Sequence, residues 1–278
     1  MKYNDKLQNV ISKNNSNLVV GLDSDINKLP SFFRNYKNPI SEFNKLIVES
    51  TKDIVSGYKL NIAFYEFLEE IGIEAIKETL AAIPDESIKI CDAKRGDIDN
   101  TAEMYAATYF DKYNFDSITL TPYMGEDAVE PFLKRENKFV YILALTSNAG
   151  HVDFQKLRTG ENYLYEEVIN KSLSWNNNNN VGFVFGANHT KEINDFTMAH
   201  PDVPLLIPGI GAQSNDLKNL MNSLNTNAFV INSSRGIIYS SKKDCNEKEF
   251  MEVVRNSALI LNKEIYTLRE SKQLTVSS

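Results

Sequence analysis

Residues 90–101 read Ile90-Cys91-Asp92-Ala93-Lys94-Arg95-Gly96-Asp97-Ile98-Asp99-Asn100-Thr101. The run 87–94 predicts a buried strand, and the glycine that follows it predicts a turn into a helix. Because side chains two apart in a strand share a face, we expect Asp92 and Lys94 on one side of the sheet, with Asp97 just past its end. Charges are costly to bury. They indicate a structural ion pair, a solvated loop or a functional site.

Similar apolar runs recur along the chain, and a helical pattern follows each of them. We expect strands at 18–22, 57–61, 87–94, 117–120, 139–145, 181–186, 205–207 and 228–232. We expect helices at 41–55, 66–82, from Asp99 or Asn100 to about 110, and at 126–134, 163–175, 190–200, 214–224 and 246–269. Strand–helix units at a spacing of roughly 25 to 40 residues predict an α/β fold with a closed parallel (β/α)8 TIM barrel. A doubly wound open sheet is the alternative, but Gly21-Leu22-Asp23 after the first strand is not a nucleotide fingerprint.

No linker or change of composition divides the 278 residues, so we expect a single domain over residues 1–278. Residues 1–16 are expected to form a polar leading helix, and residues 270–278 a frayed tail. Residues 149–162 are expected to be a long loop. The run Asn176–Asn180 indicates an exposed loop to which no role is assigned.

The composition limits the classes of function. A net charge of -7 argues against a general nucleic-acid binder, which needs a broad basic face. The chain has no signal-like start and no apolar run long enough to cross a membrane, so we expect a cytoplasmic protein with no membrane partner. Two distant cysteines, Cys91 and Cys245, indicate reduced thiols. The histidines His151, His189 and His200 lack metal-ligand spacing and are expected to be surface or loop residues.

Polar and glycine residues gather at the predicted strand ends, which is where (β/α)8 barrels carry their functional groups. They are Asp23, Lys59, Asp92, Lys94, Asp97, Ser147, Asn148, Pro208, Gly209, Gly211, Gln213, Arg235 and Gly236. Each has an ordinary structural explanation, but together they converge on one rim. The last two strand ends match a phosphate cradle, because glycines let backbone N–H groups approach an anion and an arginine grips two of its oxygens. A tight turn is the alternative explanation for these glycines.

The segment 92–98 resembles the Asp-x-Lys-x-x-Asp signature of the orotidine 5'-monophosphate decarboxylase family. Tyr-Lys-Leu-Asn-Ile-Ala-Phe-Tyr-Glu at 58–66 and Leu-Thr-Ser-Asn at 145–148 are similar to the longer bacterial group of that family. The similarity runs from Gly21 to Arg235. A whole suprafamily of barrels shares the signature alone, whereas its combination with Lys59 and the two phosphate loops is far more specific. The resemblance implies decarboxylation of orotidine 5'-monophosphate to UMP in de novo pyrimidine biosynthesis, with no cofactor and no metal.

The resemblance also implies catalytic roles. Lys94 would protonate the ring carbon as carbon dioxide leaves, and Asp92 would face the substrate carboxylate. Lys59 would join this charged network and, with Asp23, hold the ribose hydroxyls. Asp97 would reach across a homodimer interface to the ribose of the neighbouring subunit.

The same resemblance implies the remaining substrate contacts. Thr101 would cross the dimer interface together with the preceding carboxylate. Ser147, with Asn148 beside it, would recognise the amide edge of the pyrimidine. Gln213 and Arg235 would clamp the phosphate, surrounded by the loop residues Pro208, Gly209, Gly211 and Gly236.

The chemistry of the residues agrees with these roles. Loss of carbon dioxide leaves negative charge on a ring carbon, and a preorganised ammonium group can stabilise it. Lys94 between carboxylates should stay protonated and act as general acid. One alternative is a metal-dependent sugar-phosphate decarboxylase or aldolase of the same suprafamily, but those enzymes hold magnesium with a glutamate where this chain has Lys59. A non-catalytic phosphoribosyl-binding protein is the other alternative, and the intact charged positions disfavour it.

Overall fold

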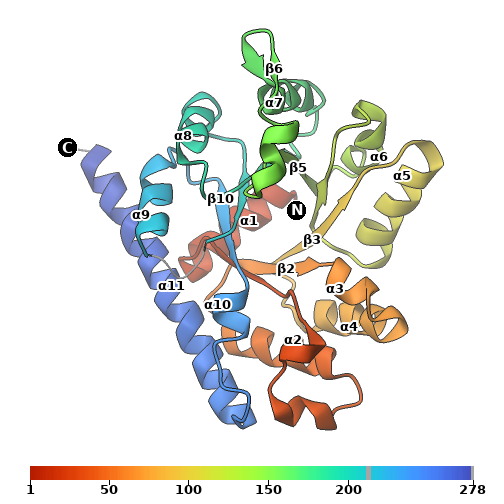
Figure 1. Ribbon diagram of the computed structural model, residues 1–278, viewed down its shortest axis with the longest axis vertical. Helices are drawn as coiled ribbons and strands as arrows, with labels where there is room; N and C mark the ends of the chain where they lie inside the picture. The colour runs from red at the N-terminus through yellow and green to blue at the C-terminus, as the bar shows by residue number, and fades with distance from the viewer. Residues whose placement is uncertain (211–213, 277–278) are drawn as a thin grey trace. The chain divides into compact units, whose positions relative to one another are not determined.

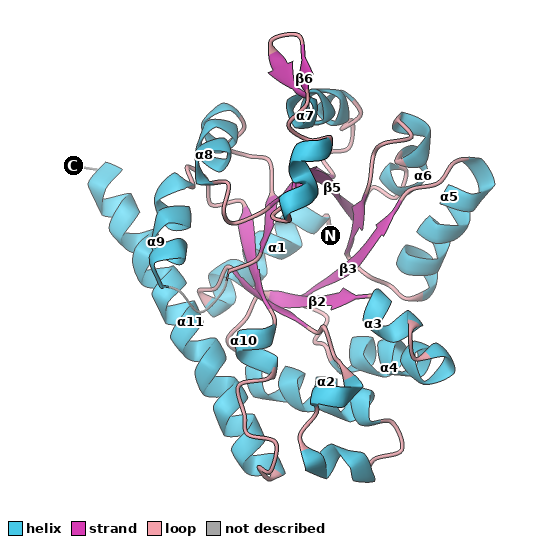
Figure 2. Ribbon diagram, in the orientation of Figure 1, coloured by secondary structure: helices cyan, strands magenta, loops and turns pink. Residues whose placement is uncertain are grey.

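The computed structural model describes residues 1–210 and 214–276. Within them, eight strands close into a barrel in the order β1-β10-β9-β8-β5-β4-β3-β2, with helices between strands along the chain (Figures 1 and 2). The (β/α)8 barrel predicted from the sequence is therefore confirmed. Two of the predicted phosphate-binding residues, Gly211 and Gln213, lie outside the described residues.

The barrel strands are short and largely buried, as expected for strands that are covered on both faces. They are β1 (Leu18–Gly21), β2 (Gly57–Asn61), β3 (Ile88–Arg95), β4 (Ser117–Leu120), β5 (Phe139–Leu145), β8 (Val181–Phe185), β9 (Leu205–Pro208) and β10 (Phe229–Ser233). The remaining strands, β6 (Arg158–Thr159) and β7 (Asn162–Tyr163), pair antiparallel as a separate hairpin. The predicted strands match these bounds to within two residues.

The α-helices alternate with the strands along the chain. They are α1 (Tyr3–Asn14), α2 (Pro39–Thr51), α3 (Ala63–Glu66), α4 (Glu69–Ala82), α5 (Asp99–Ala106), α6 (Glu130–Leu133), α7 (Leu164–Ser174), α8 (Thr190–Ala199), α9 (Ser214–Ser223), α10 (Arg235–Ile238) and α11 (Glu247–Val276). Short helical turns also occur: η1 (Ile26–Lys28), η2 (Ser31–Asn35), the π-helical η3 (Ala107–Lys112), η4 (Glu126–Ala128) and η5 (Ala149–Asp153). Among the described residues, none of these helices combines the length and apolar character that crossing a membrane requires.

The chain divides into two compact units, neither of which is continuous in sequence. The first unit comprises Met1–Asp5 and Ala93–Ile231, and the second comprises Lys6–Asp92 and Asn232–Ser278. This division places the two halves of the charged motif in different units. The single domain expected from the sequence stays a prediction.

The second unit contains β1, β2 and most of β3 as a parallel set. Gly21 pairs with Lys59, and Asn61 pairs with Asp92, so the end of β1 lies beside Lys59 and the end of β2 lies beside Asp92. Helix α2 begins cleanly because Asn38 accepts a hydrogen bond from the N–H of Ser41. On this unit α2 contacts α4 and α11 (Figure 1).

The first unit contains β4, β5, β8 and β9, again parallel to one another. Strand β5 is almost entirely apolar and buried between β4 and β8. The N-terminal Tyr3 joins this unit, stacking on Phe139 with ring centroids 4.4 Å apart and hydrogen bonding to the hydroxyl of Tyr141 at 3.0 Å. The leading helix is therefore not purely polar, because its apolar residues are buried.

Several predicted boundaries were wrong, and local backbone geometry explains two of them. The helix predicted at 66–82 is interrupted between α3 and α4, where Glu69 has a φ of 51°. Asp99 is not the N-cap of α5 but its first residue, with a φ of 50°, and Ile98 precedes it as the cap. Pro131, at the start of α6, separates that helix from η4 and shortens the helix predicted at 126–134.

Three other expectations also need correction. Residues 149–162 are not an irregular loop, because they contain η5 and the β6–β7 hairpin. Helix α11 continues to Val276, beyond the predicted start of a frayed tail. The asparagine run is a hydrogen-bonded turn: Asn180 is buried and donates to the carbonyl of Leu133, and Asn176 accepts from the N–H groups of Asn180 and Val181.

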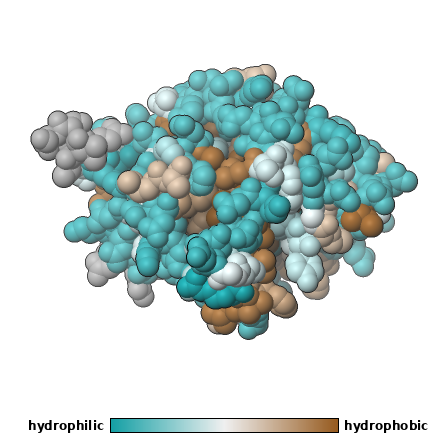
Figure 3. Space-filling view, turned by 90° about the horizontal axis from the view of Figure 1, so that it is seen from above, coloured by the Kyte–Doolittle hydropathy of each residue, from teal (hydrophilic) through white to brown (hydrophobic). Residues whose placement is uncertain are grey.

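Both cysteines are free thiols, as predicted, with Cys91 buried. Large apolar side chains are also exposed on the described surface, among them Phe67, Met104, Tyr123 and Met198. Figure 3 shows one face of the molecule, where apolar residues form separate patches among hydrophilic ones. Exposed apolar patches of this kind are common at protein–protein contacts.

Candidate active site

Lys59 is held between two carboxylates at the strand ends of the second unit. Its side chain is buried, and its Nζ lies 2.5 Å from Oδ2 of Asp92 and 3.9 Å from Oδ1 of Asp23. The parallel register of β1, β2 and β3 brings these three residues together. The sequence predicted all three, and the structure assembles them into one charged cluster.

The charge of this cluster is governed by competing effects on Lys59. Burial alone would lower the pKa of the Lys59 ammonium, but the charges of Asp92 and Asp23 and the hydrogen bond to Asp92 outweigh it, so the pKa is raised. Lys59 is therefore a cation at neutral pH. Among the described residues, no group hydrogen bonds to the buried Oδ1 of Asp23. That oxygen is an acceptor available to a ligand hydroxyl.

The segment after β1 is fixed by residues near the C-terminal end of the chain. The hydroxyl of Tyr239 donates to the carbonyl of Asp23 at 3.0 Å and accepts from the N–H of Asp25 at 2.6 Å. Burial raises the pKa of Tyr239 to about 12, so its hydroxyl stays protonated. Gly21 is required here because a Cβ would lie 1.9 Å from Oγ of Ser234.

Arg235 and Gly236, predicted as phosphate ligands, begin helix α10 and are exposed. The structure thus leaves the Arg235 guanidinium at the surface of the second unit, at the end of β10. Its exposure suits a group that meets an anion from solvent.

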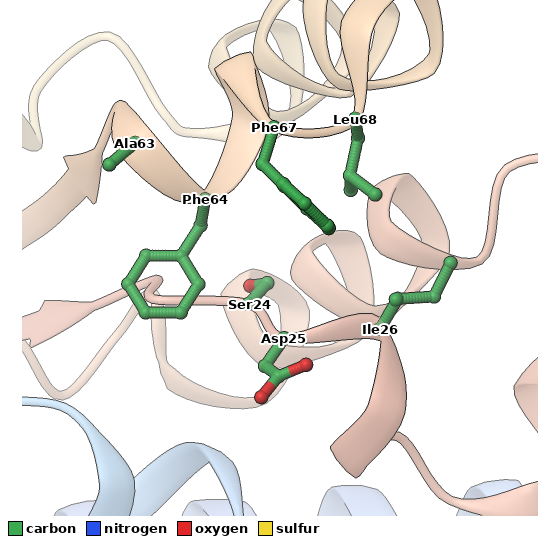
Figure 4. Close-up of a pocket in the computed structure, with 7 residues that line it drawn as sticks. All are labelled: Ser24, Asp25, Ile26, Ala63, Phe64, Phe67 and Leu68. Atoms are coloured by element: carbon green, nitrogen blue, oxygen red, sulfur yellow. The ribbon is translucent and has the colours of Figure 1, made fainter.

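A pocket of about 360 Å³ lies beside the β1 segment in the second unit. Figure 4 shows Phe64, Phe67 and Leu68 facing Ser24 and Ile26 across it. The lining is mostly apolar. The pocket was not predicted, because residues 62–65 lie between the strand expected at 57–61 and the helix expected at 66–82, whereas helix α3 begins at Ala63.

Lys94 occupies an unusual backbone position in the first unit. It has a φ of 49°, in the left-handed region that non-glycine residues rarely adopt. Its N–H donates to Oγ1 of Thr119 on β4 at 3.0 Å, and its side chain is exposed. The expected alternation of Asp92 and Lys94 assumed extended backbone throughout, and Lys94 departs from that geometry.

The turn after Lys94 is tightly packed. A Cβ at Gly96 would lie 2.6 Å from Cγ2 and 2.9 Å from the carbonyl oxygen of Thr121, so only glycine fits. Asp97 accepts a hydrogen bond from the N–H of Ile98 at 2.8 Å through Oδ1. Thr101, in the first turn of α5, is exposed.

Ser147 and Asn148 follow β5 in a segment fixed by hydrogen bonds. The N–H of Thr146 donates to Oε1 of Gln155 at 2.8 Å, and its hydroxyl donates to Oδ1 of Asn148 at 2.7 Å. Nε2 of His189 lies 2.9 Å from the carbonyl of Thr146. His189 is a loop residue as predicted, but it is buried rather than at the surface.

Two glycines bring the ends of neighbouring strands close to Ser147. A Cβ at Gly186, after β8, would lie 2.7 Å from Cβ of Ser147, and one at Gly209 would lie 3.8 Å from its Oγ. Gly209 has a φ of 97°, and Pro208 before it accepts from the N–H of Ala187 at 3.2 Å. The predicted residues Ser147 and Gly209 are therefore neighbours within the first unit.

Sequence analysis missed several residues that support these groups. Gly186 ends the sixth predicted strand and His189 follows it, and their position alone was a usable signal. Thr119 looks like an ordinary strand residue, and Tyr239 lies outside every predicted strand and helix, so neither carried a signal.

The chain is similar to known proteins over most of its length. The model of the orotidine 5'-phosphate decarboxylase / HUMPS family matches residues 16–248. An orotidine 5'-phosphate decarboxylase of Flavobacterium johnsoniae is 42% identical over 272 residues, covering 96% of this chain and 98% of that protein. One of Bacteroides fragilis is 46% identical over 244 residues, covering 84% of this chain and 88% of that protein.

A solved structure gives the same result at the level of the fold. The Leishmania donovani OMP decarboxylase matches with a TM-score of 0.83 at 33% identity, covering 97% of this chain and 99% of that one. The family model spans most of the barrel, and the two bacterial relatives align over more than four-fifths of the chain. This chain therefore belongs to the orotidine 5'-phosphate decarboxylase family.

Proposed function

We propose that this chain decarboxylates orotidine 5'-monophosphate to UMP and carbon dioxide in pyrimidine biosynthesis, using only its own side chains. The observation that carries the proposal is the buried cation of Lys59 fixed between Asp23 and Asp92. Membership of the family indicates the reaction. The cluster offers fixed charges that can stabilise a developing charge, as a metal ion would otherwise do.

The second unit contributes groups for the ribose and the carboxylate. Oδ1 of Asp23 is a free acceptor among the described residues and would take a hydrogen bond from a ribose hydroxyl. Asp92, whose other oxygen is bound to Lys59, would face the substrate carboxylate. Arg235 and Gly236 would meet the phosphate. Binding energy from this remote phosphate can then be used in the transition state.

The first unit contributes the proton donor and the base-recognition segment. Lys94 would protonate the ring carbon as carbon dioxide leaves, which stabilises the developing charge and completes the product. Ser147, with Asn148 beside it, would recognise the amide edge of the pyrimidine. Gly209 lies near Ser147, and the predicted cradle of Pro208 and Gly209 would complete the phosphate contacts.

The family model also covers the HUMPS enzymes, so a metal-dependent sugar-phosphate reaction is the second candidate. Those barrels hold magnesium with a glutamate at the place that Lys59 occupies. A buried lysine that stays charged would repel a divalent cation from this position. The cluster therefore favours decarboxylation without a metal.

Turnover in the presence of a chelator tests the metal-free reaction. We expect purified protein with excess EDTA to convert orotidine 5'-monophosphate at the same rate as untreated protein, followed by loss of substrate absorbance. The matched arm adds excess magnesium. Activity that appears only in the magnesium arm would contradict the metal-free proposal, and no activity in either arm would contradict decarboxylation itself.

We further propose that the active form is a homodimer in which Asp97 and Thr101 serve the ribose of the neighbouring subunit. The segment that carries them also exposes two apolar side chains, with Ile98 46% and Met104 62% exposed. Exposed apolar groups next to functional polar groups suit a surface that another protein covers.

Mixed dimers test the shared site. Lys94→Ala and Asp97→Ala homodimers should each be nearly inactive, whereas hybrids formed by refolding a mixture contain one site with neither substitution. Random pairing makes about half of all dimers hybrids, so we expect about a quarter of wild-type activity to return. Hybrids that form, as shown with differently tagged subunits, yet stay inactive would overturn the shared site.

A further inference from the structure

We propose that Arg95 is a positioning residue that fixes the peptide group between Ala93 and Lys94, and so aims the Lys94 ammonium. This inference rests on the proposed role of Lys94 as proton donor and adds the residues that hold it. Arg95 is not among the residues assigned to substrate. Its hydrogen bonds to Ala93 and Tyr109 lie within the first unit.

The peptide group that precedes Lys94 is held at both ends by side chains. Its carbonyl, from Ala93, accepts a hydrogen bond from Nη1 of Arg95 at 3.2 Å. Its N–H, from Lys94, donates to Oγ1 of Thr119 at 3.0 Å. The carbonyl of Arg95 itself accepts from the N–H of Thr121 at 2.9 Å, which ties the turn to the end of β4. The peptide therefore has a fixed plane and a fixed direction.

This fixation is needed because Lys94 is strained. A non-glycine residue with φ near 49° is strained and persists only where its surroundings enforce it. Strain of this kind is common at functional sites, where it aims a side chain in a direction that an extended strand would not give. The exposed Lys94 side chain leaves the backbone in the direction that this φ sets.

Arg95 can hold the peptide because its own guanidinium is anchored. Nη2 donates to the hydroxyl of Tyr109 at 2.8 Å, and the guanidinium lies over the rings of Tyr105 and Tyr109, with its Cζ 5.3 Å and 5.6 Å from their centroids. Tyr105 belongs to α5 and Tyr109 to the π-helical η3. Their rings stack with centroids 6.5 Å apart and an interplanar angle of 14°. Planar stacking and two-directional donation are properties of arginine that lysine lacks.

We call the contacts of the Arg95 guanidinium with Ala93, Tyr105 and Tyr109 the brace. The brace also joins two parts of the chain on either side of the proposed catalytic groups. The chain leaves Arg95, passes Asp97 and Thr101, and returns to the Arg95 side chain at Tyr109. π-helical turns are rare and frequently occur at functional sites. Here the π-helical segment carries the tyrosine whose hydroxyl anchors Arg95. Arg95 therefore connects the two ends of the segment that bears Lys94, Asp97 and Thr101.

Substitutions at Arg95 and Tyr109 test the brace. We expect Arg95→Gln and Arg95→Lys to lower kcat by about 10- to 100-fold, because a misaimed group loses its reactive geometry. The dissociation constant for UMP should stay within about twofold, since Arg95 is not assigned to substrate. Tyr109→Phe removes only the hydroxyl and should lower kcat less than either Arg95 substitution. For each variant, steady-state kinetics gives kcat and KM, calorimetry gives the dissociation constant for UMP, and thermal unfolding gives Tm.

Arg135→Gln is the matched control for a purely structural effect. Arg135 contacts the same two helical segments that anchor Arg95. Its Nη2 lies 2.7 Å from Oε1 of Glu103 on α5 and 2.7 Å from Oδ2 of Asp111 on η3. Its hydrogen bonds go to Glu103, Asp111 and the carbonyl of Pro131, and none of these belongs to the Lys94 peptide. We expect Arg135→Gln to lower Tm while leaving kcat near the wild-type value.

The outcomes separate this inference from the proposed function. Arg95 variants that are folded and keep wild-type kcat would overturn the brace. The brace would also be overturned if Arg95→Gln and Arg135→Gln both lose kcat in proportion to their loss of Tm. If Arg95→Gln does not fold, Arg95→Lys and Tyr109→Phe decide, and wild-type kcat in both overturns the brace. Full activity of Lys94→Ala would instead overturn the role of Lys94 itself.

Discussion

Lys94→Ala is expected to lower kcat by about 10⁴-fold or more while UMP still binds with near-normal affinity. The substitution removes both the proton donor and the cation that meets the developing charge, and effects of these two kinds multiply. The protein should remain folded because the Lys94 side chain is exposed. Steady-state decarboxylation and UMP calorimetry on the same preparation measure the two quantities.

Lys112→Ala supplies the control for simple loss of a positive charge. Lys112 is another exposed lysine of the first unit, at the end of η3, and is assigned no role. Its substitution should leave kcat unchanged. A Lys94→Ala protein with more than about one-tenth of wild-type kcat would remove Lys94 from the role of general acid.

The barrel was predictable because its strands have a simple signature. Strands covered on both faces are continuous apolar runs, and Phe139–Leu145 shows this so clearly that its predicted and observed bounds coincide. The charged strand ends were also predictable, because a carboxylate or ammonium at the end of an apolar run is conspicuous. Asp23, Lys59 and Asp92 were found in this way and do form one cluster.

The parts that could not be predicted depend on contacts between residues distant in sequence. Nothing near Lys94 in the sequence indicates a φ of 49°, and its N–H donates to Oγ1 of Thr119, 25 residues further along the chain. Likewise the buried position of Asn180 depends on a carbonyl at Leu133. Tertiary contacts of this kind override local propensity, and composition alone does not reveal them.

Lys59→Met is expected to remove about 3 to 5 kcal/mol from the free energy of unfolding and to abolish measurable turnover. Methionine fills a similar volume, but it removes from the largely buried Asp92 the cation that now lies 2.5 Å away. An unpaired buried charge costs far more than the ion pair itself contributes. Urea unfolding monitored by circular dichroism gives the free energy, and the absorbance assay gives the turnover.

The pH dependence of this effect follows from the sign of the Lys59 shift. Because its folded-state pKa is raised above 10.5, the stability contributed by its charge is fully present below that pH and is lost as the pH rises through the folded-state value. The difference between wild type and Lys59→Met should therefore be the same at about pH 7 and about pH 9. A difference that shrinks between those two values would mean that Lys59 loses its proton within the range and is not held as a cation.

The double variant Lys59→Met/Asp92→Asn separates stability from catalysis. Neutralising Asp92 removes the negative charge that Lys59 balanced, so most of the lost free energy of unfolding should return, because an apolar and neutral pair tolerates burial. Turnover should stay absent, since the charged network around the substrate is gone. A double variant that regains both properties would show that the cluster serves folding alone. One that regains stability without turnover would place the charge of Lys59 and Asp92 in the reaction.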